Sequence, residues 1–258
     1  FEQKIAEYTG SKYAIACVNG TSALHVSLLL AGVEPESEVI VPTLTFIAPV
    51  NAIAYNGAEP VFMDADEYYN IDIEKTIDFI QNETKFPDNG SQFTVNRKTG
   101  KRVAAIIPVH VWGNAAQLAD LIPLCKERNI AVVEDASESL GSFYKKGKYK
   151  GRHTGTNGML GCLSFNGNKI ITTGGGGMIL TDDDKLAEKA RYLTTQAKDD
   201  SVHYIHHEIG YNFRLTNIQA ALGVAQLEQL SAFMERKRDI FSQYKTAVEN
   251  IAGLTMTG

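Results

Sequence analysis

The chain alternates between short apolar runs and longer stretches in which apolar residues recur at helical spacing. The apolar runs predict buried strands at residues 13–18, 38–42, 60–64, 103–109 and 130–135. Helical spacing predicts helices at residues 1–8, 23–31, 45–55, 73–81 and 117–128. Strands that alternate with helices in this way indicate an α/β fold with a mostly parallel sheet covered by helices on both faces.

This alternation is interrupted twice. Residues 82–102 are polar and rich in turn residues, so we interpret them as a surface excursion with room for a small hairpin. Lys169 follows one apolar run and precedes another at 178–181, which predicts a turn between two strands. Beyond that turn, the pattern predicts a helix at 183–193, a long loop at 194–213 and one or two long helices at 216–250.

Composition narrows the class of protein. With 258 residues, 44% hydrophobic and 21% charged, the chain has the make-up of a soluble globular protein with a large core. A net charge of −5 argues against nucleic acid or an anionic membrane as the main partner. Because no apolar run is long enough to cross a membrane and the first residues do not resemble a signal peptide, we expect a cytoplasmic protein. Cys17, Cys125 and Cys162 lie within or beside apolar runs, which predicts reduced core thiols.

An anion site is predicted directly after the first strand. Asn19-Gly20-Thr21-Ser22 joins that strand to a helix without a long loop. Free backbone N–H groups and the helix dipole would then face whatever lies above Gly20. The simpler alternative is that Thr21 or Ser22 only caps the helix.

Lys169 is the second chemical feature of the sequence. It precedes the glycine tract 174–177, which predicts a lysine at the edge of a sheet with bare backbone nearby. Partial desolvation of an amine in such a place favours the neutral, nucleophilic form. The alternative is a solvated lysine on a hairpin. Ligands of parallel sheets bind at the carboxyl ends of strands, where Gly20, His110, Asp135 and Lys169 all fall.

Other binding motifs are absent or poorly formed. No G-x-G-x-x-G follows a strand, and no G-x-S-x-G is present. Residues 141–149 resemble a P-loop only loosely, because the spacing is too long and the Ser or Thr is missing. His203, His206 and His207 have poor spacing for metal ligands and no cysteine nearby, so we predict no metal site.

The ordered set of an anion cradle, the strand-end carboxylate Asp135 and the lysine Lys169 has one strong chemical meaning. Pyridoxal phosphate needs an anion site for its phosphate, a carboxylate that keeps its ring nitrogen protonated, and a lysine for the Schiff base. The sequence therefore predicts a pyridoxal phosphate enzyme.

The chain also resembles the sugar aminotransferases of the DegT/DnrJ/EryC1/StrS type, which share the aspartate aminotransferase fold. The resemblance runs from residue 1 to 228 and is carried by the segments 19–24, 42–46, 108–110, 134–136, 164–169 and 210–215. It implies a large cofactor-binding α/β domain at residues 1–230. Residues 231–258 would then begin the helical connection to a small C-terminal domain that this chain does not contain.

The family resemblance implies roles for individual residues at the cofactor. Thr21 and Ser22 would hold the phosphate from one side and Ser164 from the other. Phe46 would stack on the ring. The resemblance also implies that Asp135 pairs with the ring nitrogen and that Lys169 forms the Schiff base.

Further positions bear on assembly and specificity. Asn212 would reach the phosphate of a neighbouring subunit, which implies a homodimer with shared active sites. Glu138 would lie beside the ring, where many relatives carry Gln or His, so it should influence which sugar fits. Its alternative role is to complement a helix dipole. For His110, the alternative to a functional role is that it only fixes the neighbouring turn.

The implied activity is a two-stage transamination from glutamate to a nucleotide-linked keto sugar. In it, Lys169 would move a proton between substrate and cofactor. We expect a UDP-linked 4-keto-6-deoxy sugar, and the tract 174–177 would leave space for its pyranose ring. Because a charge of −5 cannot steer a nucleotide diphosphate, local basic groups must meet its phosphates; we expect these partly from a further domain or a partner subunit.

Other activities remain open at this stage. A dTDP- or GDP-linked sugar aminated at C3 or C4 would use the same cofactor apparatus. A sugar dehydratase of the same family would carry histidine in place of Lys169. An aminotransferase for ordinary amino acids has no supporting arginine motif here, and a cofactor-binding regulatory protein would show no turnover.

Overall fold

The chain is an α/β unit whose central sheet carries helices on both faces. The computed structural model describes residues 1–87, 90, 92–200, 202–249 and 251–256. Its strands are β1 (Tyr13–Cys17), β2 (Glu38–Pro42), β3 (Glu59–Met63), β4 (Thr84–Lys85), β5 (Val95–Asn96), β6 (Val103–Ile106), β7 (Ala131–Asp135), β8 (Leu160–Ser164) and β9 (Gly177–Thr181). Its α-helices are α1 (Glu2–Thr9), α2 (Gly20–Leu30), α3 (Ile47–Tyr55), α4 (Ile73–Asp78), α5 (Leu121–Glu127), α6 (Asp184–Thr194), α7 (Asn217–Glu228) and α8 (Leu230–Val248).

The main sheet is parallel except for one strand. Among the described residues it has seven strands in the order β1-β9-β8-β7-β6-β2-β3. β9 runs antiparallel to both of its neighbours, and every other neighbouring pair is parallel. The carboxyl ends of β1, β8, β7 and β6 therefore meet at one edge. This confirms the predicted fold class.

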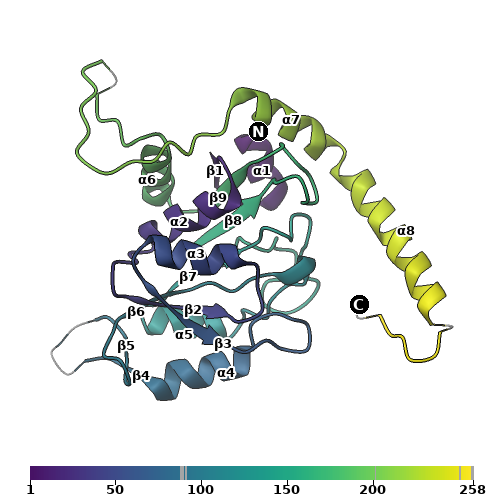
Figure 1. Ribbon diagram of the computed structural model, residues 1–258, viewed down its shortest axis with the longest axis horizontal. Coiled ribbons are helices and arrows are strands. Elements are labelled where there is room, and N and C mark those ends of the chain that lie inside the picture. Colours follow the sequence, from purple (N-terminus) through teal and green to yellow (C-terminus); the bar gives the residue numbers. More distant parts are fainter. Residues whose placement is uncertain (88–89, 91, 201, 250, 257–258) are drawn as a thin grey trace.

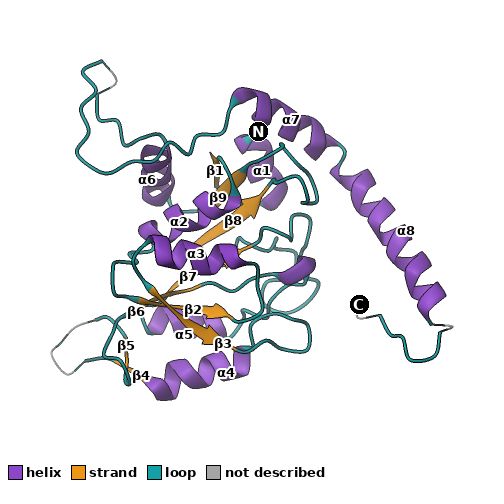
Figure 2. Ribbon diagram, viewed as in Figure 1, coloured by secondary structure: helices purple, strands orange, loops and turns teal. Residues whose placement is uncertain are grey.

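Apolar side chains fill both faces of the sheet, which explains why its strands read as continuous apolar runs. On one face α2, α3 and α6 pack against residues such as Val39, Val41 and Ile179. The opposite face packs against α4 and α5 around Ile40 and Ile106, and against α1 and the start of α8 around Leu163. Figure 2 shows the strands enclosed between these helices.

Several predicted boundaries differ from those observed. β6 ends at Ile106 rather than at residue 109, because Pro108 brings no N–H to continue the ladder. The helix predicted at 117–128 begins only at Leu121. Residues 170–173 form no strand, so Lys169 lies in a long connection between β8 and β9 rather than in a tight turn. The expected hairpin within 82–102 exists as the antiparallel pair of β4 and β5, while residues 88, 89 and 91 lie outside the described residues.

The last two helices leave the body of the molecule (Figure 1). Leu230 is buried at the start of α8, and Phe233 and Met234 pack beside it against the core that includes Phe165. The rest of α8 is mostly exposed as far as its end at Val248. The predicted end of this segment at Asn250 lies outside the described residues. No helix in the described part of the chain is long and apolar enough to span a bilayer.

Candidate active site

A cavity of about 460 Å³ opens at the carboxyl edge of the sheet, where most of the predicted site residues meet. Its walls come from the turn after β1, the start of α3, the ends of β7 and β8, and the connection after β8. The predicted residues that line it are Gly20, Thr21, Phe46, Asp135, Glu138, Ser164 and Lys169. Residues that are distant in the sequence thus form one site, as the position of each at a strand end predicts.

The N-terminus of α2 forms one wall of the cavity. Asn19, not Thr21 or Ser22, is the N-cap, and its Oδ1 accepts the Ser22 N–H at 2.8 Å. Gly20 and Thr21 occupy the first turn, where an α-helix leaves its N–H groups without intrahelical partners. A Cβ at Gly20 would lie 2.8 Å from Cβ of Ser164, so only glycine lets α2 approach β8 this closely. The side chain of Ser22 is buried and does not line the cavity.

Asp135 lies at the floor of the cavity, at the end of β7. It is only 5% exposed, and its Oδ1 accepts the backbone N–H of Ser137 at 3.0 Å. Burial raises the pKa of Asp135 above its ordinary value; the Ser137 hydroxyl, the Ser137 N–H and the charge of Lys169 offset this only in part. A cationic N–H donor placed in the cavity would stabilise this carboxylate.

The preceding residue, Glu134, serves a different purpose. Its carboxylate is fully buried and accepts the N–H groups of Asn157 and Gly158 at 2.6 Å and of Gly155 at 2.9 Å. His110 Nδ1 accepts the Ala116 N–H at 3.1 Å, so its Nε2 carries the proton that is donated to Glu134 at 2.9 Å. His110 has no exposed surface and does not line the cavity. It therefore fixes the neighbouring turns, which was its alternative role.

Lys169 reaches the cavity from the connection that follows β8. Its side chain is 14% exposed, and its Nζ lies 3.2 Å from Oε1 of Glu138. The second carboxylate oxygen of Glu138 accepts the backbone N–H of Trp112 at 3.1 Å. Glu138 is thus held from one side by the turn after β6 and holds the lysine amine on the other.

Phe46 supplies an open aromatic face on the opposite wall. It is the N-cap residue of α3, and it remains 73% exposed. Next to it, Thr45 lines the cavity with a buried Oγ1 that has no hydrogen-bond partner among the described residues. Thr45 was not singled out by the sequence, because nothing in the pattern distinguishes it from Thr43.

The sequence also gave no indication of an aromatic rim. Trp112 is 68% exposed and packs edge to face on Tyr69, with ring centroids 5.2 Å apart. Both residues have left-handed backbones, with φ of 52° for Trp112 and 67° for Tyr69. Buried Asn70 joins the two turns by accepting the Val111 N–H at 3.1 Å. Bulky residues rarely adopt positive φ, and such strain concentrates at functional sites.

Asn212 is not brought to this cavity. It lines a separate hollow of about 540 Å³ together with Arg191, Lys198 and Arg214, on the surface beside β1. The glycine tract does not line the cavity either. A Cβ at Gly177 would lie 2.3 Å from the Asn19 carbonyl oxygen, so this glycine serves the close packing of β9 against the start of α2. The expected space for a pyranose ring is therefore not provided there.

The three clustered histidines pair with nearby residues. His203 binds Asp200, His207 binds Asp199, and His206 Nδ1 lies 2.9 Å from the Gln196 carbonyl oxygen. In the described ranges, no group of His, Cys, Asp and Glu has the arrangement of a metal site.

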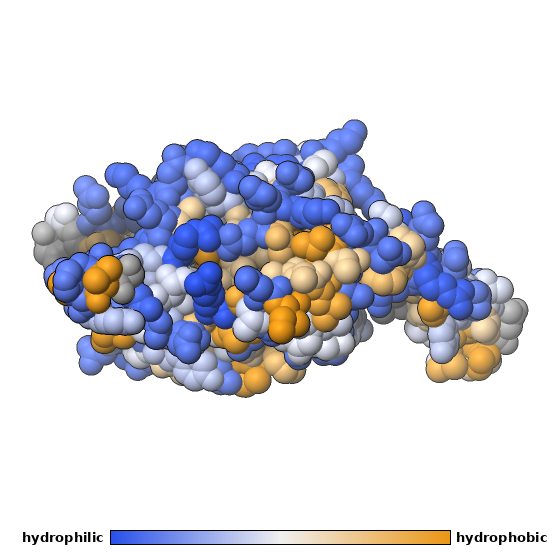
Figure 3. Space-filling view, turned by 90° about the horizontal axis from the view of Figure 1, so that it is seen from above, coloured by the Kyte–Doolittle hydropathy of each residue, from blue (hydrophilic) through white to orange (hydrophobic). Residues whose placement is uncertain are grey.

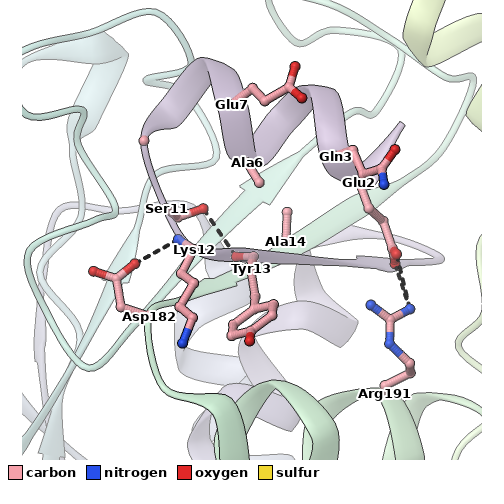
Figure 4. A pocket seen from close by; sticks show the side chains of 11 residues that line it. Glu2, Gln3, Ala6, Glu7, Ser11, Lys12, Tyr13, Ala14, Asp182 and Arg191 are labelled. Atoms are coloured by element: carbon pink, nitrogen blue, oxygen red, sulfur yellow. Dashed lines mark hydrogen bonds and ion pairs between the residues drawn. The ribbon is translucent and has the colours of Figure 1, made fainter.

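A larger hollow lies elsewhere on the surface, between α1 and α6. It measures about 960 Å³, and Figure 4 shows Glu2 and Arg191 facing one another across it. Arg191 pairs with Glu2 at 3.0 Å, and the Lys12 N–H donates to Asp182 at 2.8 Å (Figure 4). This hollow lies where β1 begins and β9 ends, whereas the smaller cavity at the carboxyl ends of the parallel strands holds the predicted site residues.

Comparison with known proteins agrees with this geometry. Residues 1–258 match the DegT/DnrJ/EryC1/StrS aminotransferase family. The chain belongs to this family. A GDP-perosamine synthase of Escherichia coli O157:H7 is 42% identical over 252 residues, which cover 97% of this chain and 63% of that protein.

Solved structures of the family share the fold. A DegT DnrJ EryC1 StrS aminotransferase from Brucella abortus has a TM-score of 0.85 at 30% identity, over 100% of this chain and 65% of that one. DesV of S. venezuelae, solved in complex with a ketimine intermediate, has a TM-score of 0.83 at 27% identity, over 99% and 64% of the two chains. This chain thus spans less than two thirds of the length of these relatives.

Pyridoxal phosphate is the cofactor of this family, and the cavity fits it. The first turn of α2 offers N–H groups to a phosphate, with the Ser164 side chain beside it. Asp135 is buried, and among the described residues the charge of Lys169 and the bonds from Ser137 offset this burial only in part, so a protonated ring nitrogen would be a fitting partner. Lys169 opens into the same space, and Phe46 offers a face for stacking.

Proposed function

We propose that the protein carrying this chain is a pyridoxal phosphate-dependent aminotransferase that aminates a nucleotide-linked keto sugar, with glutamate as the amino donor. The observation that carries the proposal is that the first turn of α2, Asp135 and Lys169 line one cavity at the strand ends. Membership of the family supports the reaction class.

Different residues of the chain have different roles at the cofactor. The cofactor, when bound, supplies an electron sink for charge that develops at the substrate carbon. Asp135 holds the ring nitrogen in its protonated form, and Gly20, Thr21 and Ser164 hold the phosphate end. Phe46 covers one ring face and limits the access of water.

Lys169 has two tasks in this proposal. It binds the cofactor covalently, and once displaced by an amino donor its free amine moves a proton as base and then as acid. Glu138, 3.2 Å from Nζ, holds the amine near the reacting carbon. The backbone N–H of Trp112 in turn fixes the direction of the Glu138 carboxylate.

Borohydride reduction tests the assignment of the lysine. Reduction of the cofactor-loaded protein followed by peptide mapping should place the adduct on Lys169. Lys169→Ala should remain folded, bind the cofactor only non-covalently and show no transamination. Lys145→Ala, on an exposed loop, is the matched control and should keep the adduct. An adduct on Lys145, Lys146 or Lys148 would overturn the assignment.

The proposal leaves a choice between nucleotides for the sugar substrate. The family resemblance around Glu138, Gly141 and the glycine tract led us to expect a UDP-linked 4-keto-6-deoxy sugar. A relative that is 42% identical is named GDP-perosamine synthase and supports a GDP-linked one. A panel of UDP-, GDP- and dTDP-linked keto sugars, assayed with glutamate, discriminates between them. If glutamate bleaches the colour of the bound cofactor but none of these sugars is aminated, the amino acceptor belongs to another class of compound.

A shared active site is part of the proposal. Asn212 lies outside the cavity of its own chain, and apolar side chains around it are exposed, among them Ile209 at 81% and Ile218 at 84%. Figure 3, which views this end of the molecule, shows apolar side chains gathered in the middle of the face. Burial of this surface by a second copy would bring Asn212 to the neighbouring cavity.

Subunit mixing tests this arrangement. Lys169→Ala and Asn212→Ala should each be inactive alone, and hybrid dimers should regain activity through one intact site. Absence of rescue after verified subunit exchange would count against shared sites. We also propose that residues 231–258 connect the domain at 1–230 to a further domain, which limited proteolysis of the complete protein would release.

A further inference from the structure

Residues 138–142 form the turn that carries Glu138 towards Lys169. The backbone of this turn packs on the turn after β6, because a Cβ added to Gly113 would lie 3.4 Å from the Glu138 carbonyl oxygen. The Glu138 carboxylate also accepts the Trp112 N–H at 3.1 Å. A shift of the turn at 138–142 would therefore change where this carboxylate meets the Lys169 amine, which lies 3.2 Å from it.

His153 and Thr154 hold this turn by hydrogen bonds, and neither residue has exposed surface. The Gly141 N–H donates to Nε2 of His153 at 2.9 Å. The Thr154 N–H donates to the Ser142 carbonyl oxygen at 3.0 Å, and the Thr154 hydroxyl donates to the Ser139 hydroxyl at 2.7 Å. The turn is thus bonded to a segment that is itself fully buried.

The hydrogen bonds of His153 require a neutral ring that carries its proton on Nδ1. Because a backbone N–H can only donate, Nε2 must accept the bond from Gly141. Nδ1 then carries the proton and donates it to the Thr154 carbonyl oxygen. Burial lowers the pKa of His153 to about 4, so the ring is neutral at neutral pH and keeps its acceptor.

The surroundings of His153 keep its ring in one orientation. The rings of Phe143 and Tyr8 pack edge to face on it, with centroids 5.0 and 6.1 Å away. The loop 155–158, which follows in the chain, is bonded through its N–H groups to the buried carboxylate of Glu134. A histidine that is fixed by packing and by the chain after it can serve as a rigid acceptor for the turn that it holds.

We propose that His153 is a positioning residue for the reaction at Lys169, an inference that rests on the proposed function. By accepting the Gly141 N–H, it fixes the turn 138–142 so that Glu138 holds the lysine amine in one direction. An amine held in this way is oriented towards the cofactor carbon to which it attaches. His153 is fully buried and is not part of the cavity lining, so it acts through Glu138.

The rate at which the cofactor attaches to Lys169 tests this proposal. Cofactor-free protein is mixed with pyridoxal phosphate, and the adduct is trapped with borohydride at successive times and measured on the Lys169 peptide. His153→Leu removes both ring nitrogens and should slow attachment about tenfold, which is the size of effect expected for one lost hydrogen bond. His153→Gln keeps an acceptor near the position of Nε2 and should stay within about threefold of the parent.

A double-mutant cycle separates positioning from a contribution to stability alone. In a Glu138→Ala protein, His153→Leu should slow attachment by less than about twofold further, because the group that it positions is already absent. Thr154→Val is a milder second variant, and it should slow attachment about threefold only while Glu138 is present. Thr84→Val removes a buried hydrogen bond to Ile80 away from the cavity and should change the rate less than about twofold. Urea denaturation checks that each variant is folded.

Two outcomes of these rate measurements would overturn the proposal. One is equal slowing by His153→Leu with and without Glu138, and the other is a His153→Gln protein as slow as His153→Leu. Nitrogen NMR spectra that show the proton of His153 on Nε2 would also overturn it. Absence of a Lys169 adduct in the parent protein would instead contradict the proposed function, and the inference with it.

Discussion

Glu134 and Asp135 are neighbours at the end of β7, and both are buried, yet their surroundings are opposite. Glu134 accepts hydrogen bonds from His110 and from three backbone N–H groups of the loop 155–158. Burial raises its pKa, but these hydrogen bonds outweigh that effect, and the pKa lies below its ordinary value. Asp135 is bonded to Ser137, and its pKa lies above its ordinary value because of burial.

The difference separates a carboxylate that completes the fold from one that awaits a ligand. A buried charge costs free energy unless donors surround it. Around Glu134 the chain supplies these donors itself, and the loop that supplies them is fixed as a result. Around Asp135 the chain supplies fewer, so the carboxylate is left for a cation that enters the cavity. The following predictions test this contrast.

The largest effect is expected at Glu134. Glu134→Ala leaves His110 and three buried N–H groups without an acceptor and should lower the free energy of unfolding by about 3–5 kcal/mol. Urea denaturation followed by circular dichroism measures this loss. Glu188→Ala, on the exposed side of α6, is the control and should stay within about 0.5 kcal/mol of the parent. A Glu134→Ala protein as stable as that control would contradict the structural role.

Asp135→Asn should affect activity instead of stability. The unfolding free energy should remain within about 1 kcal/mol of the parent or rise, because a poorly compensated buried charge is removed. Transamination should slow about 10²–10³-fold, the size of effect that follows loss of one charge-stabilising group. The borohydride adduct on Lys169 should persist. If the variant unfolds as readily as Glu134→Ala, Asp135 also has a structural role and does not differ from Glu134 as proposed.

The two carboxylates should also give opposite pH dependences of stability in the cofactor-free protein. The pKa of Glu134 is lowered on folding, so its contribution is present above about 4.5 and is lost as the pH falls through the folded value. The pKa of Asp135 is raised, so its contribution declines as the pH rises from about 3.8 through the folded value. Glu134→Gln should flatten the acid side of the stability profile, and Asp135→Asn should steepen it. Unfolding free energies should be measured between pH 3 and 6, a range that extends about one to two units around the ordinary pKa values of both groups. Their change with pH shows either slope.

Ser137→Ala should give the smallest effect. It removes the hydroxyl that stabilises the charged form of Asp135 but keeps the backbone N–H bond. Activity should fall only about threefold to tenfold, as expected for one hydrogen bond of about 0.5–1.5 kcal/mol. The acid limb of the pH–rate profile should move to higher pH, because the hydroxyl that lowers the pKa of Asp135 is lost. A loss as large as that of Asp135→Asn would mean that Ser137 acts on substrate directly.

The sequence could predict the sheet and the edge at which the site lies. Apolar runs alternating with helices determine the layers. Asp135 ends a strand, and Gly20 and Lys169 each follow one. Their positions at the strand ends allowed these residues to be predicted as neighbours in one cavity. The predictions that failed were element boundaries that depend on tertiary contacts, such as the end of the strand predicted at 103–109, which stops at Ile106.

The hydrogen-bond partners of the buried side chains could not be predicted from the sequence. Glu134 and Asp135 are adjacent acidic residues, and only the loop 155–158, more than twenty residues later, distinguishes them. The strained aromatic pair of Tyr69 and Trp112 depends on two turns that meet only in space. The position of α8 likewise depends on the contact of Met234 with Gly141, which is distant in the sequence.

The pairing of β1 with β9 has a consequence for the order of events during synthesis. Cys17 lies opposite Gly177, so the first strand of the sheet has no neighbour until 160 further residues (177 − 17) have been made. At about 5–20 residues per second, the ribosome needs on the order of ten seconds or more to produce them. The turn Asn19-Gly20, which packs against Gly177, is therefore completed late. The proposed phosphate site is therefore complete only after β9 has emerged, and until then α1 and α2 are the elements that can cover the apolar strand β1.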